Sequence, residues 1–259
     1  MNLQLNPSLA REYTSQAQVA RVLTENWLAN EAYCPSCLSS LQQAKANSRV
    51  LDFVCYNCNS QYELKSKNGT FGRKITDGAY SAMMDRLRSP GSPHFFFLNY
   101  SADFKVKNLI AVPSYFLQAS SIEKRNPLSQ NARRAGWVGC NIITSQIPEA
   151  GKISIVSDSL IIKPDMVRKA WGKTHFLSTE DNLESRGWLL DIIGCIERLN
   201  QPEFSLQKMY EFENELSIKH PNNQHIKDKI RQQLQFLRDK GHINFVRPGF
   251  YKINGEQNA

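Results

Sequence analysis

Several features that define large classes of proteins are missing from this chain. Among its 259 residues no apolar run approaches the roughly 20 residues that a membrane span needs. The N-terminal residues lack the basic segment followed by an apolar one that marks a secretion signal. With 13 glycines and 11 prolines, the composition excludes a collagen-like or low-complexity chain. We therefore expect an intracellular protein without a membrane partner.

Sequence motifs for nucleotide binding are also missing. There is no G-x-x-x-x-G-K-S/T loop and no G-x-G-x-x-G segment after a strand, so we expect no nucleotide cofactor. The five histidines show no spacing typical of a metal site or a catalytic dyad. Hydrophobic residues (41%) and charged residues (22%) suffice for a packed core inside a hydrated surface. The length allows one large domain or two modest ones.

Acidic residues are scarce in two stretches of this basic chain, whose formal net charge is +8. Residues 60–140 carry 12 basic and 5 acidic residues, and residues 219–252 carry 8 and 2. In contrast, residues 184–218 carry 3 basic and 7 acidic residues. Positive charge concentrated in two separate places favours a polyanionic partner, and we expect a nucleic acid that is bound twice.

Four of the six cysteines have the spacing of a zinc site. They form C-P-S-C and C-Y-N-C turns separated by seventeen residues, and these are Cys34, Cys37, Cys55 and Cys58. Two such turns can place four thiolates around one tetrahedral ion. Disulfides are the alternative in an oxidising compartment, and a redox motif would need only one such turn. We predict a structural Zn²⁺ site, with Cys140 and Cys195 as buried apolar residues.

A carboxylate pair and a lysine surround the second cysteine turn. Residues 49–54 and 60–65 are rich in branched and aromatic side chains and are predicted to pair as a β-hairpin. Alternate side chains of a strand share a face, so Glu63 and Lys65 point together, and Asp52 can lie opposite them. Such carboxylates can hold Mg²⁺. The alternative is a surface charge pair across two strands.

In its order of motifs the chain resembles the PD-(D/E)xK nucleases. Asp52, ten residues and then Glu63-Leu64-Lys65 match the motif, although Leu51 replaces its proline. Helical spacing at 9–28 and 75–88, with strands at HFFFLNYS and KNLIAVPSYF, fits the α-β-β-β-α-β core of that family. With the cysteine site, residues 1–254 resemble the methyl-dependent type II restriction endonucleases of this superfamily. The expected fold is a mixed α/β sheet protein carrying a Cys₄ zinc insertion.

This resemblance implies an activity and a set of roles. It implies cleavage of double-stranded DNA at GATC sites whose adenine is N6-methylated. By motif position, Asp52 and Glu63 become Mg²⁺ ligands, Leu64 lends its backbone carbonyl, and Lys65 becomes the catalytic lysine. It further implies a monomer in the cytoplasm of a prokaryotic cell.

The C-terminal third reads as a winged helix. Apolar residues at helical spacing predict helices at 184–199, 206–220 and 223–241, and INFV, Arg247-Pro248-Gly249 and FYKI predict a β-hairpin. In that fold the third helix enters the major groove and the wing lies against the DNA backbone. We therefore divide the chain into a nuclease domain at 1–183, a winged helix at 184–254 and a disordered tail at 255–259.

Basic and polar side chains near these elements are candidate DNA contacts. The candidates are Arg73, Lys74, Arg133, Arg134, Trp137, Asn223, Gln224, His225, Lys227, Lys229, Arg231 and Arg247. Arginines and lysines suit phosphate, and Trp137 suits stacking on a base or contact with a methyl group. The alternatives are a buried core tryptophan, a winged helix that serves only for protein contacts, and a solvated charged helix face.

Three functions agree with these patterns. The preferred one is the methyl-dependent endonuclease. The second is a non-catalytic zinc and winged-helix regulator in which the Glu63 and Lys65 pattern arises by chance, and the third is a repair nuclease that ignores methylation. Only the regulator predicts that Asp52 and Glu63 can be replaced by alanine without loss of function.

Overall fold

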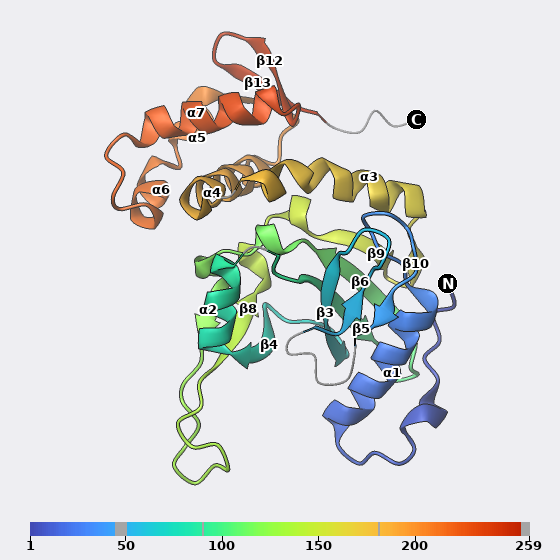
Figure 1. Cartoon of the computed structure of the whole chain (residues 1–259). Coiled ribbons are helices and arrows are strands. Elements are labelled where there is room, and N and C mark those ends of the chain that lie inside the picture. Colours follow the sequence, from blue (N-terminus) through green and yellow to red (C-terminus); the bar gives the residue numbers. More distant parts are fainter. Residues whose placement is uncertain (45–50, 90, 181, 255–259) are drawn as a thin grey trace. The chain divides into compact units, whose positions relative to one another are not determined.

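The computed structural model (Figure 1) describes residues 1–44, 51–89, 91–180 and 182–254. Residues 49–50 of the first predicted strand and the predicted tail at 255–259 lie outside the described residues. The chain divides into two units, Met1–His175 and Phe176–Ala259, and each is described by itself.

A mixed seven-stranded sheet forms the centre of the first unit. Its strands, in spatial order, are β1 (Gln42–Gln43), β2 (Phe53–Val54), β3 (Gln61–Asn68), β5 (His94–Tyr100), β6 (Val106–Val112), β9 (Ile153–Ser157) and β10 (Leu160–Ile161). The β3–β5 pair is parallel and every other pair in this sheet is antiparallel. The strands predicted from HFFFLNYS and KNLIAVPSYF are confirmed as β5 and β6. A parallel pair needs a crossover, which residues 69–93 supply.

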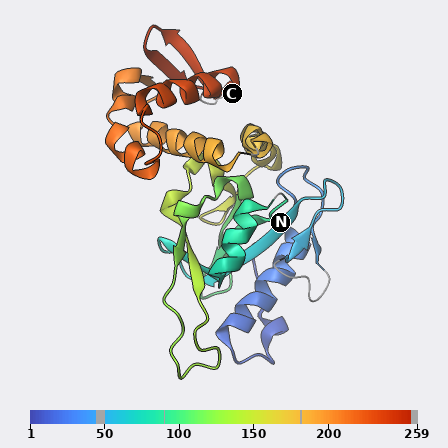
Figure 2. The ribbon, with the colours of Figure 1, turned by 60° about the vertical axis from the view of Figure 1, so that its left-hand side comes forward.

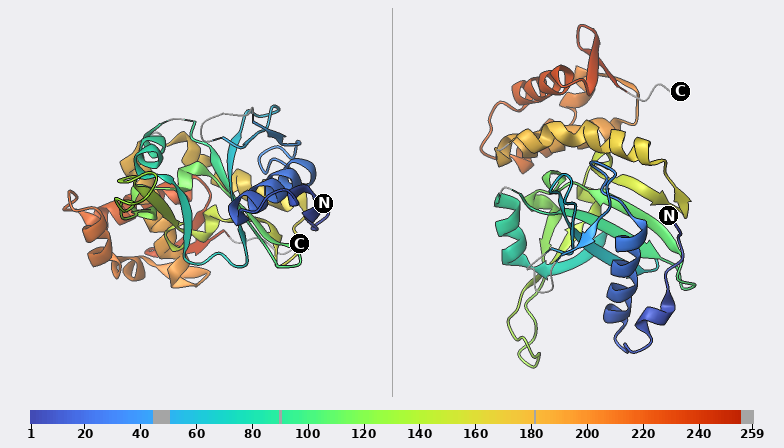
Figure 3. Two further views of the ribbon diagram at one scale, coloured as in Figure 1. Left: turned by 90° about the horizontal axis from the view of Figure 1, so that it is seen from below. Right: turned by 45° about the vertical axis from the view of Figure 1, so that its right-hand side comes forward.

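One face of this sheet carries the main hydrophobic core. Phe96 and Leu98 on β5 pack with Trp27 of helix α1 (Gln16–Glu31) and Trp171 of helix α3 (Pro164–Thr174). All four side chains are 5% exposed or less. Figure 3 shows α1 lying along the sheet. Both helices therefore cover the same face.

The opposite face receives the polar residues of β3. Because the side chains of a strand alternate, Leu64 packs against the core, whereas Glu63 and Lys65 point to the other side. There they lie in register with Phe95 and Phe97 of β5. The sequence prediction that Leu64 turns inward is confirmed.

A small antiparallel sheet and a short helix accompany this second face. The sheet has the order β4 (Lys74–Ala79), β8 (Gly139–Ile143) and β7 (Ile122–Lys124), and helix α2 spans Tyr80–Arg88. The helix predicted over 75–88 is therefore wrong in its first five residues. Ile75 and Asp77 are buried, whereas Lys74, Thr76 and Gly78 are exposed, as in a strand with one buried face. Pairing with β8 makes this segment a strand rather than a helix.

The first helix differs in its start from the helix predicted over 9–28. Pro7–Ala10 form a 3₁₀ turn (η1), and α1 begins only at Gln16, after Ser15. Further 3₁₀ turns are η2 (Ser114–Phe116), η3 (Ala119–Ser121), η4 (Thr144–Gln146), η5 (Glu149–Gly151) and η6 (His175–Thr179). Within the described residues, no helix is long and apolar enough to cross a bilayer.

The second unit is a winged helix, as predicted. Its elements are α4 (Leu183–Leu199), β11 (Glu203–Ser205), α5 (Leu206–Tyr210), α6 (Glu213–Lys219), α7 (Ile226–Asp239), β12 (Ile243–Arg247) and β13 (Phe250–Ile253). Strand β11, which the sequence did not predict, pairs with β13 and makes the wing three-stranded. The predicted inward residues of the third helix, Ile226, Ile230, Leu234 and Leu237, are buried on α7.

The single helix predicted over 206–220 is instead α5 and α6. The break lies at Glu211 and Phe212, where the Phe212 N–H donates to the Met209 carbonyl in a tighter turn. This turn brings the Phe212 ring beneath the guanidinium of Arg198, at 4.7 Å. A tertiary contact therefore overrides the helical periodicity of the segment.

Candidate active site

Four charged side chains form a closed ring of ion pairs on the second face of the large sheet. Lys65 Nζ contacts Glu63 Oε1 and Asp77 Oδ1, and Arg86 Nη1 donates to Glu63 Oε2. The ring closes between Arg86 Nη2 and Asp77 Oδ2 at 3.6 Å. Strand β3 supplies two members, while β4 and α2 supply one each. Hereafter we call Glu63, Lys65, Asp77 and Arg86 the ion ring.

The ion ring is largely shielded from water. The Asp77 side chain is 1% exposed, that of Glu63 10%, and those of Lys65 and Arg86 17%. Charges at this depth are tolerated only when they are paired. Burial lowers the pKa of Lys65, but the charges of Glu63 and Asp77 outweigh it and hold the pKa above its usual value. Lys65 is therefore a cation at neutral pH.

Asp52 lies against the backbone beside Glu63. Its N–H donates to the Tyr62 carbonyl (3.1 Å), and its Oδ2 accepts the Leu64 N–H at 2.7 Å. The N–H and C=O of one strand residue point to the same edge, so the Leu64 carbonyl also faces Asp52. Burial and the negative charge of Asp52 raise the pKa of Glu25 on α1. Glu25 is therefore an acidic residue close enough to Asp52 to feel its charge.

These oxygens fit a hard divalent cation. Carboxylates and a backbone carbonyl are the ligand types that Mg²⁺ accepts. Both oxygens of Glu63 already accept from Lys65 and Arg86, so an ion bound to this carboxylate would have to displace at least one of these two cations from it. Asp52, Glu63 and the Leu64 carbonyl are the groups that would hold the ion.

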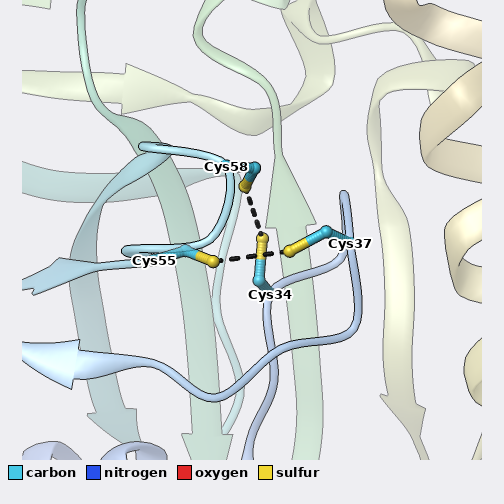
Figure 4. Close-up of side chains that lie close together, drawn as sticks. All are labelled: Cys34, Cys37, Cys55 and Cys58. Atoms are coloured by element: carbon cyan, nitrogen blue, oxygen red, sulfur yellow. Dashed lines mark hydrogen bonds between the residues drawn. The ribbon is translucent and has the colours of Figure 1, made fainter.

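The four cysteine sulfurs lie together, as Figure 4 shows. They are within 4.8 Å of one another, with Cys34 Sγ 3.5 Å from Cys58 Sγ and Cys37 Sγ 3.4 Å from Cys55 Sγ. Ligands at about 2.3 Å around a tetrahedral ion stand roughly 3.8 Å apart, so the cluster fits Zn²⁺. All four are free thiols, which agrees with a metal site rather than with disulfides.

Neighbouring polar side chains contact the cysteine thiols, and some of them change a thiol pKa. Burial raises the pKa of Cys37, but hydrogen bonds from Ser39 and Asn57 outweigh it and lower the pKa to about 6. The Tyr62 hydroxyl lies 3.0 Å from Cys34 Sγ. Because Tyr62 precedes Glu63 on β3, the cysteine cluster is tied directly to the strand that carries the ion ring.

Cys140 and Cys195 do not join this cluster. Both are fully buried, which confirms the prediction that they are apolar core residues. Cys140 lies opposite Asp77 in the β4–β8 pairing. Among the described residues, the four clustered cysteines are the one group that meets the distance limits for a metal site of three or more ligands.

The basic candidates near β4 differ in their surroundings. Lys74, at the start of β4, pairs with Glu123 of β7. Arg73 immediately precedes it, is exposed, and uses its carbonyl to accept the Thr144 N–H. Arg73 is thus exposed and has no ion pair among the residues that the structure describes, whereas the charge of Lys74 is shared with a carboxylate.

A long loop between β7 and β8 carries the next three candidates. Figure 2 shows residues 125–138, in light green, extending away from the small sheet. Arg133 and Arg134 are exposed, and the guanidinium of Arg134 lies 4.8 Å from the centre of the Trp137 ring. Trp137 is half-buried, so part of its side chain is open to solvent.

The polar candidates of the winged helix surround the start of α7. Gln224 and His225 are exposed and Asn223 is half-buried, with the Asn223 side chain accepting the His225 N–H at 2.8 Å. Asn223 therefore fixes the turn that leads into the helix. Gln224 and His225 remain available at its N-terminal end.

The basic candidates of α7 divide into two groups. Lys227 and Arg231 lie 5.6 and 5.7 Å from the Tyr210 ring, and Lys227 also pairs with Glu213 at 3.2 Å. Lys229 is half-buried, and its ammonium is paired with no carboxylate among the described residues. The structure thus holds two of the three cations against α5 and α6.

Arg247, at the end of β12, is the basic candidate of the wing. Its guanidinium lies 3.9 Å from the Phe250 ring and 3.4 Å from Glu203. These contacts hold an exposed cation at the tip of the hairpin.

Sequence reasoning missed Asp77 and Arg86. Asp77 fell inside a segment assigned to a helix, and Arg86 looked like one basic residue of a polar helix face. The burial of Ile75 and Asp77 between exposed neighbours, which marks the strand, is a property of the folded chain and not of the sequence pattern. It leaves a carboxylate pointing inward, where it needs a charged partner.

Comparison with known protein families covers nearly the whole chain. Residues 1–180 match the family described as DpnI, the Dam-replacing family. Residues 184–253 match the DpnI_C family, described as the Dam-replacing HTH domain. The chain therefore belongs to the DpnI family of restriction enzymes, with the helix-turn-helix domain of that family at its C-terminal end.

Proposed function

We propose that this protein is a Mg²⁺-dependent endonuclease that cleaves double-stranded DNA at GATC sites whose adenine is N6-methylated. The observation that carries the proposal is the placement of Asp52 on the Leu64 N–H, next to Glu63 and Lys65. In this proposal Asp52, Glu63 and the carbonyl of Leu64 hold the ion, and the charged Lys65 lies beside Glu63. Family membership supports a nuclease, and the helix-turn-helix domain supports DNA as the partner.

Each member of this group has a distinct task in the proposed reaction. When bound, Mg²⁺ supplies a Lewis acid that activates water and offsets charge on the scissile phosphate. Asp52 and Glu63 orient their oxygens for the ion, and the carbonyl of Leu64 completes the protein ligands. Lys65, held as a cation, orients the attacking water and stabilises negative charge on the phosphoryl oxygens.

Structural zinc supports this site without taking part in the chemistry. The cysteine turns flank β2, and Tyr62 joins the cluster to β3. We propose that zinc fixes the hairpin and thereby the separation of Asp52 from Glu63.

DNA contacts are proposed for both units. Arg73, Arg133 and Arg134 would meet phosphates in the first unit, and Trp137 would meet a base or its methyl group. In the second unit the α7 candidates would lie in the major groove, with Arg247 on the backbone. We also propose that the protein acts as a monomer in the cytoplasm, which light scattering of the purified protein tests.

Plasmid DNA with and without adenine methylation tests the proposal directly. Purified protein is incubated with each plasmid in Mg²⁺ or in EDTA, and the products are separated on a gel. We expect discrete fragments only from methylated DNA in Mg²⁺. Cleavage of both plasmids would instead indicate a methylation-independent repair nuclease. Folded, zinc-loaded protein that binds DNA and cuts neither plasmid would indicate a regulator.

A further inference from the structure

The ion ring contains two residues that the proposed chemistry does not use, Asp77 and Arg86. We propose that both are positioning residues: Asp77 keeps Lys65 at the site and favours the divalent ion, while Arg86 competes with the ion for Glu63. The inference deepens the proposed function and rests on it for the identity of the metal ligands.

The contacts of Glu63 set up this competition. Its Oε1 accepts from Lys65 and its Oε2 accepts from Arg86, so both oxygens are engaged. A divalent ion on Glu63 must take at least one of these oxygens. Lys65 or Arg86 then loses a carboxylate partner inside a largely buried site.

Asp77 is the carboxylate that remains for both cations. It contacts Lys65 and lies 3.6 Å from Arg86, and its side chain is almost completely buried. Each oxygen of Asp77 has one of the two cations as its partner, Lys65 at Oδ1 and Arg86 at Oδ2. We therefore assign its effect to Lys65 and Arg86 rather than to direct contact with the ion.

Electrostatics gives the two residues opposite effects on metal affinity. The ion ring has two carboxylates and two cations, and a divalent ion adds two positive charges beside Lys65 and Arg86. Loss of the negative charge of Asp77 makes this addition less favourable, whereas loss of the positive charge of Arg86 makes it more favourable. At short distances inside a protein, one charge changes affinity by on the order of tenfold or more.

Binding of Mn²⁺ to the DNA-free protein tests the inference, with the free ion counted by electron paramagnetic resonance. The site is defined as the Mn²⁺ that the wild type binds and Glu63→Gln does not. We expect Asp77→Asn to weaken this binding about tenfold and Arg86→Met to strengthen it by a similar factor. The double variant should return toward the wild type, since both charges are then gone.

Two exposed neighbours on α2 provide matched controls. Asp85→Asn and Arg88→Met make the same charge changes at side chains that are 76% and 66% exposed, and we expect little effect on Mn²⁺ affinity. In cleavage assays Asp77→Asn should lower kcat while KM for DNA stays unchanged, because Asp77 does not reach the surface. A variant that merely weakened the fold would not produce shifts of opposite sign.

Three results of the Mn²⁺ experiment would overturn the inference. These results are an Mn²⁺ affinity unchanged in Asp77→Asn, shifts of the same sign in both single variants, or a loss in Asp77→Asn as complete as in Glu63→Gln. Should Asp77→Asn fail to fold, Arg86→Met still tests whether Arg86 competes with the ion, and the double variant still tests whether loss of Asp77 offsets that effect. A wild type that binds Mn²⁺ through Glu63 but cuts no DNA would refute the nuclease proposal alone. A wild type without Glu63-dependent binding would refute this inference.

Discussion

Neighbouring side chains of β3 have opposite environments, and this alternation creates the chemistry of the site. Leu64 packs into the main core, while Glu63 and Lys65 on either side of it face the small sheet. Lys65 is then held between two carboxylates, which keep its ammonium charged in spite of burial. A charged lysine beside a phosphate can stabilise charge that develops in the transition state.

Replacing Lys65 by alanine should remove cleavage and keep DNA binding. We expect a loss of at least about 10²-fold in the cleavage rate, because one cation at the reacting phosphate is gone. Stability should fall by about 3 kcal/mol, since two buried carboxylates then share Arg86 alone. Gel cleavage assays, DNA-binding assays and urea unfolding measure the three effects. Lys67→Ala is the matched control, because Lys67 points the same way from β3 but is exposed; equal losses in both variants would contradict the role of Lys65.

Asp191 on α4 gives the winged helix a measurable dependence on pH. It is buried and bonds to Lys219 (2.8 Å) and to His220 (2.9 Å), and the His220 ring stacks on Trp188. Burial raises the pKa of Asp191, but the bonds from His220 and Lys219 outweigh it and hold the pKa below the usual 3.8. Its contribution to stability is therefore complete above pH 3.8 and is lost as the pH falls through the lower, folded pKa.

The variant Asp191→Asn should lack this part of the pH dependence. At pH 6 we expect it to be less stable than the wild type by about 2 kcal/mol, because a charged hydrogen-bond acceptor is lost. The difference should shrink as the pH falls below 3.8, because the carboxylate of the unfolded wild type then takes up a proton before that of the folded protein does. Urea unfolding of the full chain between pH 3 and 6 measures it. Asp239→Asn, at an exposed residue paired with Arg238, serves as control; a constant difference for Asp191→Asn across this range would contradict the assignment.

Among the elements, the β2–β3 hairpin depends most on a metal ion. Strand β2 has only two residues, and two ladder positions join it to β3. So short a pairing is marginal without further support. Cys55 directly follows β2, so a metal bound by the cysteine turns would fix this end of the strand, and Asp52 precedes its other end. The position of a proposed Mg²⁺ ligand thus depends on zinc.

Cys58→Ser should damage folding and activity together. Serine does not replace a thiolate as a zinc ligand, so zinc content should fall well below equimolar. Because binding of structural zinc contributes folding free energy, the first unit should unfold at a lower temperature. Elemental analysis and calorimetry measure both effects. Cys195→Ser, outside the cluster, should keep its zinc; loss of zinc from Cys58→Ser without a change in stability would contradict a structural role.

Across the whole molecule, positive charge is distributed over both units. The stretches 60–140 and 219–252 lie in different units, and each supplies exposed cations that contact no carboxylate among the described residues. In the second unit Lys229 is half-buried and contacts no carboxylate among the described residues, whereas Lys227 and Arg231 are held against Tyr210. Contacts with phosphate from both units should make DNA binding strongly dependent on salt.

Lys229→Ala should reduce this salt dependence. We expect the slope of log Kd against log salt concentration to fall by about 1, and affinity to fall by a similar factor for every DNA sequence. Fluorescence anisotropy between 50 and 300 mM salt measures the slope. Lys208→Ala, an exposed residue of α5 paired with Glu211, is the control. An unchanged slope in Lys229→Ala would remove Lys229 from the DNA interface.

The sequence by itself determined those features that depend on local spacing. Two cysteine turns predicted the metal cluster, because four thiolates at that spacing can surround one ion. Alternation along 61–65 predicted that Glu63 and Lys65 share a face and that Leu64 turns inward. Apolar periodicity predicted α4 and α7, since each helix buries one continuous stripe. Family resemblance added the assignment to this group of restriction enzymes, which the family comparison confirmed.

The tertiary structure alone decided which distant residues meet. Residues 75–79 have helical spacing, yet pairing with β8 makes them a strand, and this turns Asp77 inward. Arg86 reaches the same place from α2, so the ion ring joins residues up to 23 positions apart. Local periodicity carries no information about such contacts, because long-range pairing and the cost of burying a charge are settled only when the elements pack.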